Sequence, residues 1–114
     1  MGSVLEEKSF QFAIRIVELN RFLRDNKKEF VMSKQILRSG TSIGANVAEA
    51  QYAQSKADFL TKMHISLKEA NETKYWLRIL HASGYIKDKE FESMLNDNKN
   101  IIGTLVKIIK TAKS

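Results

Sequence analysis

The absence of proline constrains the fold of this chain more than any other feature of its sequence. None of the 114 residues is proline and only 5 are glycine, whereas roughly 5% proline is usual. β-Sandwiches, barrels and loop-rich folds need both residues in their turns. The composition therefore disfavours those folds.

Apolar residues recur at intervals of three and four in four segments of the chain, as they do in amphipathic helices. Because short connections make sequential helices antiparallel, we predict one all-α domain over residues 1–114. Its expected architecture is a left-handed, up-down-up-down four-helix bundle. The predicted helices span approximately residues 3–24, 31–53, 56–82 and 88–112.

Local signals mark the ends of the last two helices. Ser55 and Asp58 have the capping-box spacing of a hydroxyl residue and an acid three positions later. Gly84 suits the left-handed conformation that follows a helix end, and Asp88 is a good N-cap for the next helix. In that last helix the apolar residues follow heptad spacing, in which Asn98 is expected to fix the register. The heptad residues are Phe91, Leu95, Asn98, Ile102, Leu105, Ile109 and Ala112.

Small residues line one face of the second helix. The run from Arg38 to Gly44 superficially resembles a phosphate-binding loop, but it lacks the Lys-Ser/Thr pair that such a loop requires. Gly40, Gly44 and Ala48 instead recur every four residues, on one side of a helix. Because glycine inside a helix costs about 1 kcal/mol relative to alanine, we interpret this face as a site of close packing. A ligand site is the alternative.

Polar residues form a line along each of the two central helices. If the two lines face each other, they form a hydrogen-bonded network within or between subunits. A binding groove is the alternative interpretation. The residues are Arg38, Ser42, Asn46 and Glu49 in the second helix and Lys62, Ser66, Glu69 and Thr73 in the third.

The residues of common catalytic and metal sites are missing from the sequence. The chain has no cysteine, which excludes disulfides, thiolate metal sites and a cysteine nucleophile. A di-iron site in a helix bundle needs glutamate three residues before histidine. Thr61 precedes His64 and Arg78 precedes His81 at that distance. We therefore expect no metal, no cofactor and no catalytic residue, and predict a non-enzymatic protein.

The sequence also indicates a soluble, cytoplasmic protein. The most apolar stretch, from Ile101 to Ile109, is short and contains Lys107, so no segment is expected to span a membrane. The N-terminus lacks the basic start and the apolar core of a secretory signal.

An excess of basic residues favours a polyanionic partner. The chain has 19 lysines and arginines against 13 acidic residues, a formal net charge of +6, which favours binding to RNA or DNA. Ordinary solvation of the surface is the alternative. Basic residues gather around the first connection and along the last helix, where they could contact phosphates without reading bases. The candidate nucleic-acid-binding residues are Lys27, Lys28, Lys34, Arg38, Lys99, Lys107, Lys110 and Lys113.

The two central helices resemble a known family. The resemblance begins with the run from Gln35 to Ala50 and continues through the third helix to Leu77. It is to a bacterial four-helix-bundle family that includes proteins encoded in intervening sequences of 23S ribosomal RNA genes, also called S23 ribosomal proteins. The matching residues of the third helix and its start are Ser55, Asp58, Phe59, Lys62, Lys68, Glu69, Ala70, Glu72, Thr73, Tyr75, Trp76 and Leu77.

This resemblance implies self-association into a ring, a homopentamer. It also implies kinship with the accessory variability protein of diversity-generating retroelements, a basic ring that binds nucleic acid and a reverse transcriptase. The leading hypothesis is therefore a non-enzymatic oligomeric scaffold that binds RNA or DNA through phosphate contacts. The alternative is a protein–protein interaction module without nucleic-acid binding, because the second and third helices carry apolar and small residues beyond their main stripes.

Overall fold

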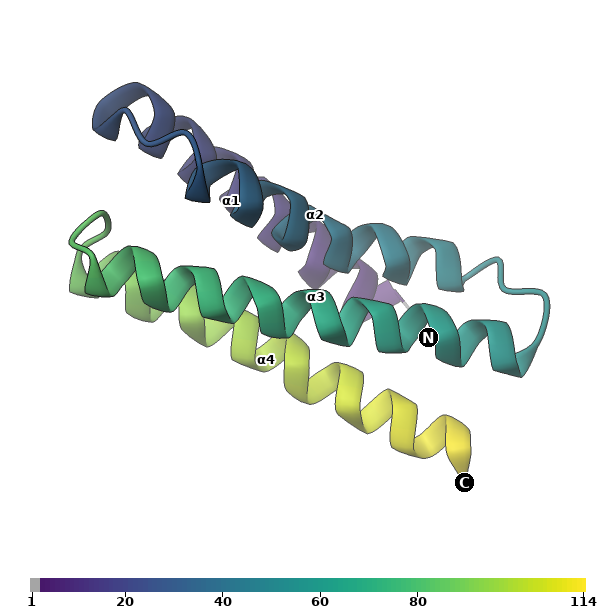
Figure 1. The fold of residues 1–114 in the computed structure, drawn as a ribbon. Helices are drawn as coiled ribbons and strands as arrows, with labels where there is room; N and C mark the ends of the chain where they lie inside the picture. Colours follow the sequence, from purple (N-terminus) through teal and green to yellow (C-terminus); the bar gives the residue numbers. More distant parts are fainter. Residues whose placement is uncertain (1–2) are drawn as a thin grey trace.

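The computed structural model describes residues 3–114, which form four long helices (Figure 1). No strand occurs among these described residues, so the predicted all-α fold is confirmed. The helices are α1 (Ser3–Lys27), α2 (Met32–Ala50), α3 (Lys56–Ala82) and α4 (Asp88–Lys113).

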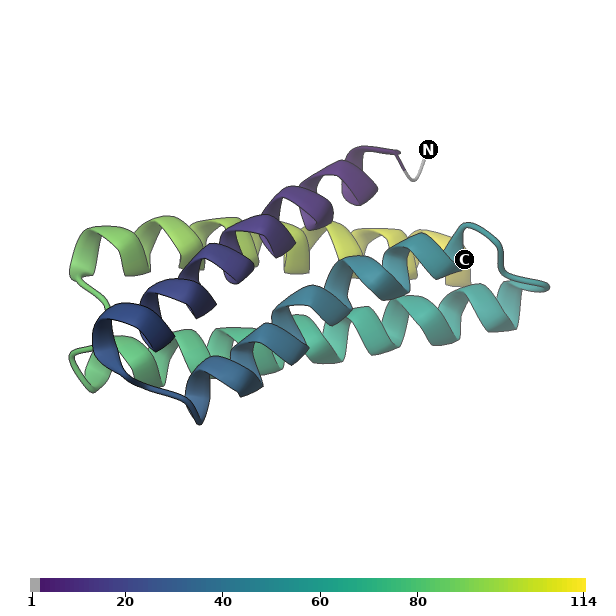
Figure 2. The ribbon, with the colours of Figure 1, turned by 90° about the horizontal axis from the view of Figure 1, so that it is seen from above.

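The four helices form an elongated antiparallel bundle that measures 44 × 20 × 19 Å. In Figure 1, α1 and α2 form a layer above α3 and α4. Each helix packs against the next one in the chain, and α1 closes the bundle against α4 through the least extensive of these interfaces. Figure 2 shows that α1 is inclined to α4, which limits the length over which the two helices can touch. The predicted four-helix bundle is confirmed.

The core is one continuous apolar cluster to which all four helices contribute. Removing apolar side chains from water at about 25 cal/mol per Å² is the dominant force that holds such a bundle together. The largest fully buried side chains are Leu5, Phe12, Ile16, Leu23, Ile36, Ile43, Met63, Leu77, Leu80, Met94, Ile101 and Leu105.

The buried line of α4 differs in part from the heptad prediction. Met94 and Ile101 occupy core positions, whereas the predicted Leu95 and Ile102 are only partly buried. α4 packs against both α1 and α3, so the residues that point between these two neighbours are the buried ones. The apolar stripe of α4 is wider than the surface that its neighbours cover.

Several local signals act as the sequence predicts. The Ser55 hydroxyl accepts a hydrogen bond from the backbone N–H of Asp58 (3.0 Å). The Asp58 carboxylate in turn accepts one from the backbone N–H of Gln54 (3.1 Å). Gly84 has φ = 83°, in the left-handed region. Asp88 is the exception, because it is the first residue of α4 and Lys87 occupies the N-cap without a side-chain hydrogen bond.

The connection between α1 and α2 is organised by a glutamate that the sequence analysis did not single out. α1 continues past the predicted residue 24 to Lys27, and α2 ends at Ala50 rather than at residue 53. Lys28 has φ = 53°, which ends α1. The buried Glu29 carboxylate then accepts hydrogen bonds from the backbone N–H groups of residues 31, 32 and 33 at 3.2, 3.0 and 2.7 Å. It thereby satisfies free donors of the first turn of α2.

Candidate functional site

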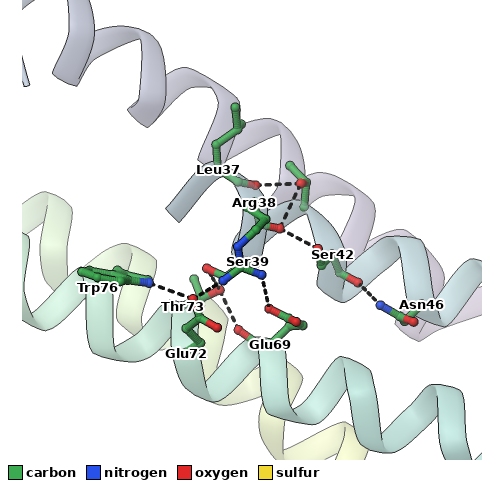
Figure 3. A network of polar contacts seen from close by, with 10 residues as sticks. Leu37, Arg38, Ser39, Ser42, Asn46, Glu69, Glu72, Thr73 and Trp76 are labelled. Carbon is green, nitrogen blue, oxygen red and sulfur yellow. Dashed lines mark hydrogen bonds and ion pairs between the residues drawn. The ribbon is translucent and has the colours of Figure 1, made fainter. Parts of the chain in front are cut away.

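An arginine of α2 is held between two carboxylates of α3 (Figure 3). Arg38 Nη1 lies 3.1 Å from Glu69 Oε1, and Arg38 Nη2 is paired with Glu72. The indole N–H of Trp76 donates to the same Glu72 carboxylate at 3.0 Å. The Arg38 side chain is 48% exposed and that of Glu69 only 11%, so this group of charges lies at the edge of the α2–α3 interface.

Further polar contacts extend along the same interface. Lys62 Nζ lies 2.8 Å from Glu49 Oε1, and the buried Ser66 hydroxyl donates to the backbone carbonyl of Ile43 at 2.9 Å. The hydroxyls of Ser39 and Thr73 are hydrogen-bonded at 2.9 Å with both side chains buried. Together with Arg38 and its partners, these contacts form an intramolecular network that joins α2 to α3.

Two of the predicted network residues do not reach across the interface. The Ser42 hydroxyl donates to the Arg38 carbonyl at 2.6 Å, and the Asn46 amide donates to the Ser42 carbonyl at 2.9 Å. Both bonds stay within α2. The network instead includes Ser39, Glu72 and Trp76, which do not belong to the predicted polar lines. The four-residue spacing of Glu72 and Trp76 is the sequence signal that identifies them as neighbours on α3.

The ion pairs fix the charges of this network near neutral pH. The Trp76 indole N–H and the Arg38 guanidinium hold the pKa of Glu72 below its usual range. Hydrogen bonding to Glu72 in turn raises the pKa of Arg38, and the Glu49 carboxylate raises the pKa of Lys62. All of these shifts favour the charged forms, as expected for pairs that hold two helices together.

The described residues present neither a cluster of metal ligands nor a membrane span. Within residues 3–114, no three histidine or acidic side chains lie close enough together to hold a metal ion. None of the described helices is long and apolar enough to cross a membrane.

The predicted nucleic-acid-binding residues fall into separate groups. Lys27, Lys28 and Lys34 lie around the α1–α2 connection, whereas Lys113 lies at the C-terminal end of α4, at the opposite end of the 44 Å bundle (Figure 1). Arg38 is engaged with two carboxylates of α3. The structure therefore does not bring the predicted residues together in one site.

Several lysines of α4 lie on the side of that helix that adjoins α3. The Asn98 amide donates to the Ala70 carbonyl at 3.1 Å, and Asp97 contacts Arg15 of α1 at 2.6 Å. With 3.6 residues per turn, Lys99 lies about 200° around α4 from Asp97 and therefore on the side of α3. By the same geometry Lys110 and Lys113 also lie on the side of α3, whereas Lys107 points to solvent next to them. We call the basic residues on and beside this side of the two helices the α3–α4 basic face. They are Lys56, Lys74 and Arg78 of α3 and Lys99, Lys107, Lys110 and Lys113 of α4.

Most carboxylates of α3 and α4 are turned away from the α3–α4 basic face. They pair with arginines of α1 and α2, on the other sides of their helices. The exposed carboxylates of α4 on the side of the face are Glu92 and Asp88, and Asp88 is paired with His81. The residues of the face form no ion pair among the described residues. The ion pairs with α1 and α2 join Glu69 and Glu72 to Arg38, and Glu90 and Asp97 to Arg15.

A second surface, on α1 and α2, is apolar. Phe10 is 60% exposed and Ile14 is 40% exposed, although both are large hydrophobic side chains. Phe10 and Ala13 line a groove of about 560 Å³ together with Gly44, Ala45 and Ala48 of α2. The polar residues Glu6, Glu7 and Thr41 line it as well. We call the residues Phe10, Ala13, Ile14, Ala45 and Ala48 the α1–α2 apolar face.

Comparison with known proteins gives the family of the chain. Residues 4–107 match the family described as 23S rRNA-intervening sequence protein. The chain belongs to this family. The resemblance predicted from α2 and α3 is thus confirmed, while the kinship with the accessory variability protein stays a prediction.

A solved structure from the S23 ribosomal protein family is closely similar to this chain. It is a protein with unknown function from the S23 ribosomal protein family of Bacteroides thetaiotaomicron VPI-5482. It shares 57% sequence identity with the chain over 96% of this chain and 97% of the other, with a TM-score of 0.94. No curated protein matches the chain.

The two surfaces belong to different layers of the bundle. The α1–α2 apolar face belongs to the upper layer of Figure 1, and the α3–α4 basic face belongs to the lower layer. One subunit can therefore use both surfaces at once.

Proposed function

We propose that this chain is a non-enzymatic, cytoplasmic, self-associating scaffold that binds RNA or DNA through backbone phosphates. The observation that carries the proposal is the α3–α4 basic face. Its lysines and arginine are free of ion pairs among the described residues, because the neighbouring carboxylates pair with Arg15 and Arg38. A row of unpaired cations along two helices fits the repeating phosphates of a nucleic-acid strand better than it fits a small ligand.

The physical basis of this binding is the release of counterions. Each phosphate that a lysine neutralises frees about 0.9 cation from duplex DNA, and about 0.7 from a single strand. From Lys56 to Arg78, α3 is about 33 Å long at 1.5 Å per residue. The basic face is thus long enough to follow several consecutive phosphates of one strand.

The test is a salt titration of binding to labelled RNA and DNA of mixed sequence. We expect binding at low salt, little dependence on base sequence, and an affinity that falls steeply as the salt concentration increases. A protein that binds neither nucleic acid at low salt, or whose affinity does not change with salt, contradicts the proposal.

Self-association is the second part of the proposal, and we place it on the α1–α2 apolar face. The small residues of α2 let another helix approach closely, and burial of the exposed Phe10 and Ile14 would favour association by the hydrophobic effect. The resemblance to the family makes a homopentamer the expected assembly.

The oligomeric state can be measured by light scattering. Phe10→Asp is expected to yield smaller assemblies because it puts a charge on the apolar face. Tyr52→Asp provides the matched control, since Tyr52 is 88% exposed in the connection between α2 and α3. An unaltered protein that is monomeric at micromolar concentration contradicts the assembly. Dissociation by the Tyr52 variant contradicts the placement.

The alternative function is a protein–protein interaction module, and the α1–α2 apolar face is the observation that favours it. In that case the face would bind a different protein rather than another copy of the chain. Purification of a stoichiometric partner that nuclease treatment does not remove, combined with no binding to RNA or DNA, would support this alternative.

A further inference from the structure

A cavity lies where the end of α3 meets the start of α4, at one end of the α3–α4 basic face. It has a volume of about 450 Å³ and includes two aromatic rings, those of Tyr75 and Phe91. Arg78 and His81 line it as well. Neither the phosphate contacts proposed above nor the α2–α3 network requires these aromatic residues.

Tyr75 is an exposed aromatic ring next to a fixed neighbour. It is 55% exposed, and its ring centroid lies 5.4 Å from that of Trp76 in an edge-to-face arrangement. Trp76 is itself held by its hydrogen bond to Glu72, which is paired with Arg38. The polar network between α2 and α3 therefore restrains the residue against which Tyr75 packs.

The other side of the cavity is also ordered by aromatic contacts. The rings of His81 and Phe91 are stacked, with 4.0 Å between centroids and an interplanar angle of 2°. His81 Nε2 also lies 2.7 Å from Asp88 Oδ1, so this carboxylate is engaged at the start of α4. Phe91 thus has one face covered by His81.

We propose that this cavity receives an unpaired base of single-stranded nucleic acid, which stacks on Tyr75 while the α3–α4 basic face holds the backbone. This inference rests on the proposed function and assigns the type of strand to it. Arg78 lines the cavity together with Tyr75, and Lys74 lies one helical turn before Arg78 on the basic face. An aromatic ring next to cations is the arrangement that single-stranded nucleic acids need, because bases stack on the ring and phosphates contact the cations.

A duplex cannot use the cavity in this way. Its bases are stacked on each other and paired, so their faces are not available to Tyr75. The α3–α4 basic face can still contact duplex phosphates. Loss of the Tyr75 ring is therefore expected to weaken binding of the single strand and to leave binding of the duplex unchanged.

The experiment compares Tyr75→Ala, Tyr75→Phe and the unaltered protein in binding to a single-stranded oligonucleotide and to a duplex of the same length. We expect Tyr75→Ala to weaken binding of the single strand about tenfold, a value within the range for loss of one stacked base. Tyr75→Phe keeps the ring and is expected to bind nearly normally. The slope of affinity against salt is expected to stay the same in both variants.

Two further measurements distinguish the loss of base stacking from a general effect of removing an exposed tyrosine. Tyr52→Ala removes a tyrosine that is even more exposed, 88%, at the opposite end of α3, and is expected to bind like the unaltered protein. Fluorescence of Trp76, the single tryptophan of the chain, is expected to change when the single strand binds and to change less when the duplex binds.

The outcomes distinguish this inference from the proposed function. If the unaltered protein binds the strand with a steep salt dependence but Tyr75→Ala binds equally well, the base site is wrong and the phosphate-binding function stands. Equal loss of single-strand and duplex binding in Tyr75→Ala also overturns the base site. Failure of the unaltered protein to bind either nucleic acid overturns both.

Discussion

The backbone of Gly40 in α2 packs directly against the side chain of Ile16 in α1. A Cβ atom at residue 40 would lie 2.7 Å from Ile16 Cγ1, which is closer than carbon atoms can approach without displacement. Ile16 is fully buried and its side chain is branched at Cβ, so it has little freedom to move aside. This contact explains why a residue that weakens helices stands in the middle of α2.

Substitution of Gly40 tests that explanation. We expect Gly40→Ala to lower the free energy of unfolding by about 1–3 kcal/mol, since overpacking outweighs the gain in helix propensity. Gly103→Ala is the matched control, because an added Cβ there meets no atom within 4 Å; it is expected to raise the stability by up to about 1 kcal/mol. Urea denaturation followed by circular dichroism measures both. Equal effects of the two substitutions would contradict the packing explanation.

The buried hydroxyl pair of Ser39 and Thr73 is expected to show coupling. Thr73→Val leaves the buried Ser39 hydroxyl without this partner and should cost about 1 kcal/mol. Ser39→Ala should cost less, because the Thr73 hydroxyl also bonds to the Glu69 carbonyl at 2.8 Å. A double-mutant cycle measured by urea denaturation should give a coupling of about 0.5–1.5 kcal/mol. Strictly additive effects would mean that the two hydroxyls do not stabilise each other.

Glu72 should make the stability of the bundle depend on pH. Its pKa is lower in the folded state because it accepts hydrogen bonds from Trp76 and Arg38. Its contribution is therefore complete above the pKa of an unfolded glutamate, about 4.3, and is lost as the pH falls through the lower folded value. We expect the stability difference between the unaltered protein and Glu72→Gln to shrink from pH 7 to pH 3.

The control for this pH dependence is Glu92→Gln. Glu92 is exposed and belongs to none of the ion pairs of the described residues. Its substitution removes the same charge outside the network, so a change in the pH dependence that occurs only with Glu72→Gln is due to the network. A Glu72→Gln curve parallel to that of the unaltered protein would show that the network does not stabilise the folded state through this charge.

Nucleic-acid binding should depend more on the lysines of α4 than on those of the α1–α2 connection. A triple variant with Lys107→Gln, Lys110→Gln and Lys113→Gln is expected to reduce the slope of log affinity against log salt by up to about 1 per lysine. A second triple variant with Lys27→Gln, Lys28→Gln and Lys34→Gln removes the same formal charge at the other end of the bundle. If both variants lose affinity equally, the binding reflects net charge and not the α3–α4 basic face.

Residues that act on their immediate neighbours were predictable from the sequence. The Ser55 cap and the left-handed Gly84 satisfy requirements of the chain within a few residues of themselves. The periodicity of apolar residues likewise reflects a single helix at a time. Glu29 shows the limit of this reasoning, because a glutamate that caps the following helix has no distinctive sequence pattern.

The candidate site depended on contacts that no local pattern encodes. The sequence indicated that polar lines on the second and third helices could meet, but it did not select Ser39 or Glu72 as the members that do. It also grouped lysines by position in the chain. The basic face instead arises because α3 and α4 are side by side and because Arg15 and Arg38 bind the carboxylates of these helices.

The sequence by itself determined that the chain forms four amphipathic helices, since spacing and capping are properties of one helix and its ends. It also contained the residues of α2 and α3 that match the family and the excess of basic over acidic residues. Only the tertiary structure decided which residues of each apolar stripe are buried, which carboxylates are paired and which cations lie together. Those outcomes depend on the rotation of each helix about its axis, and that rotation is fixed by packing against neighbours such as Ile16 beneath Gly40.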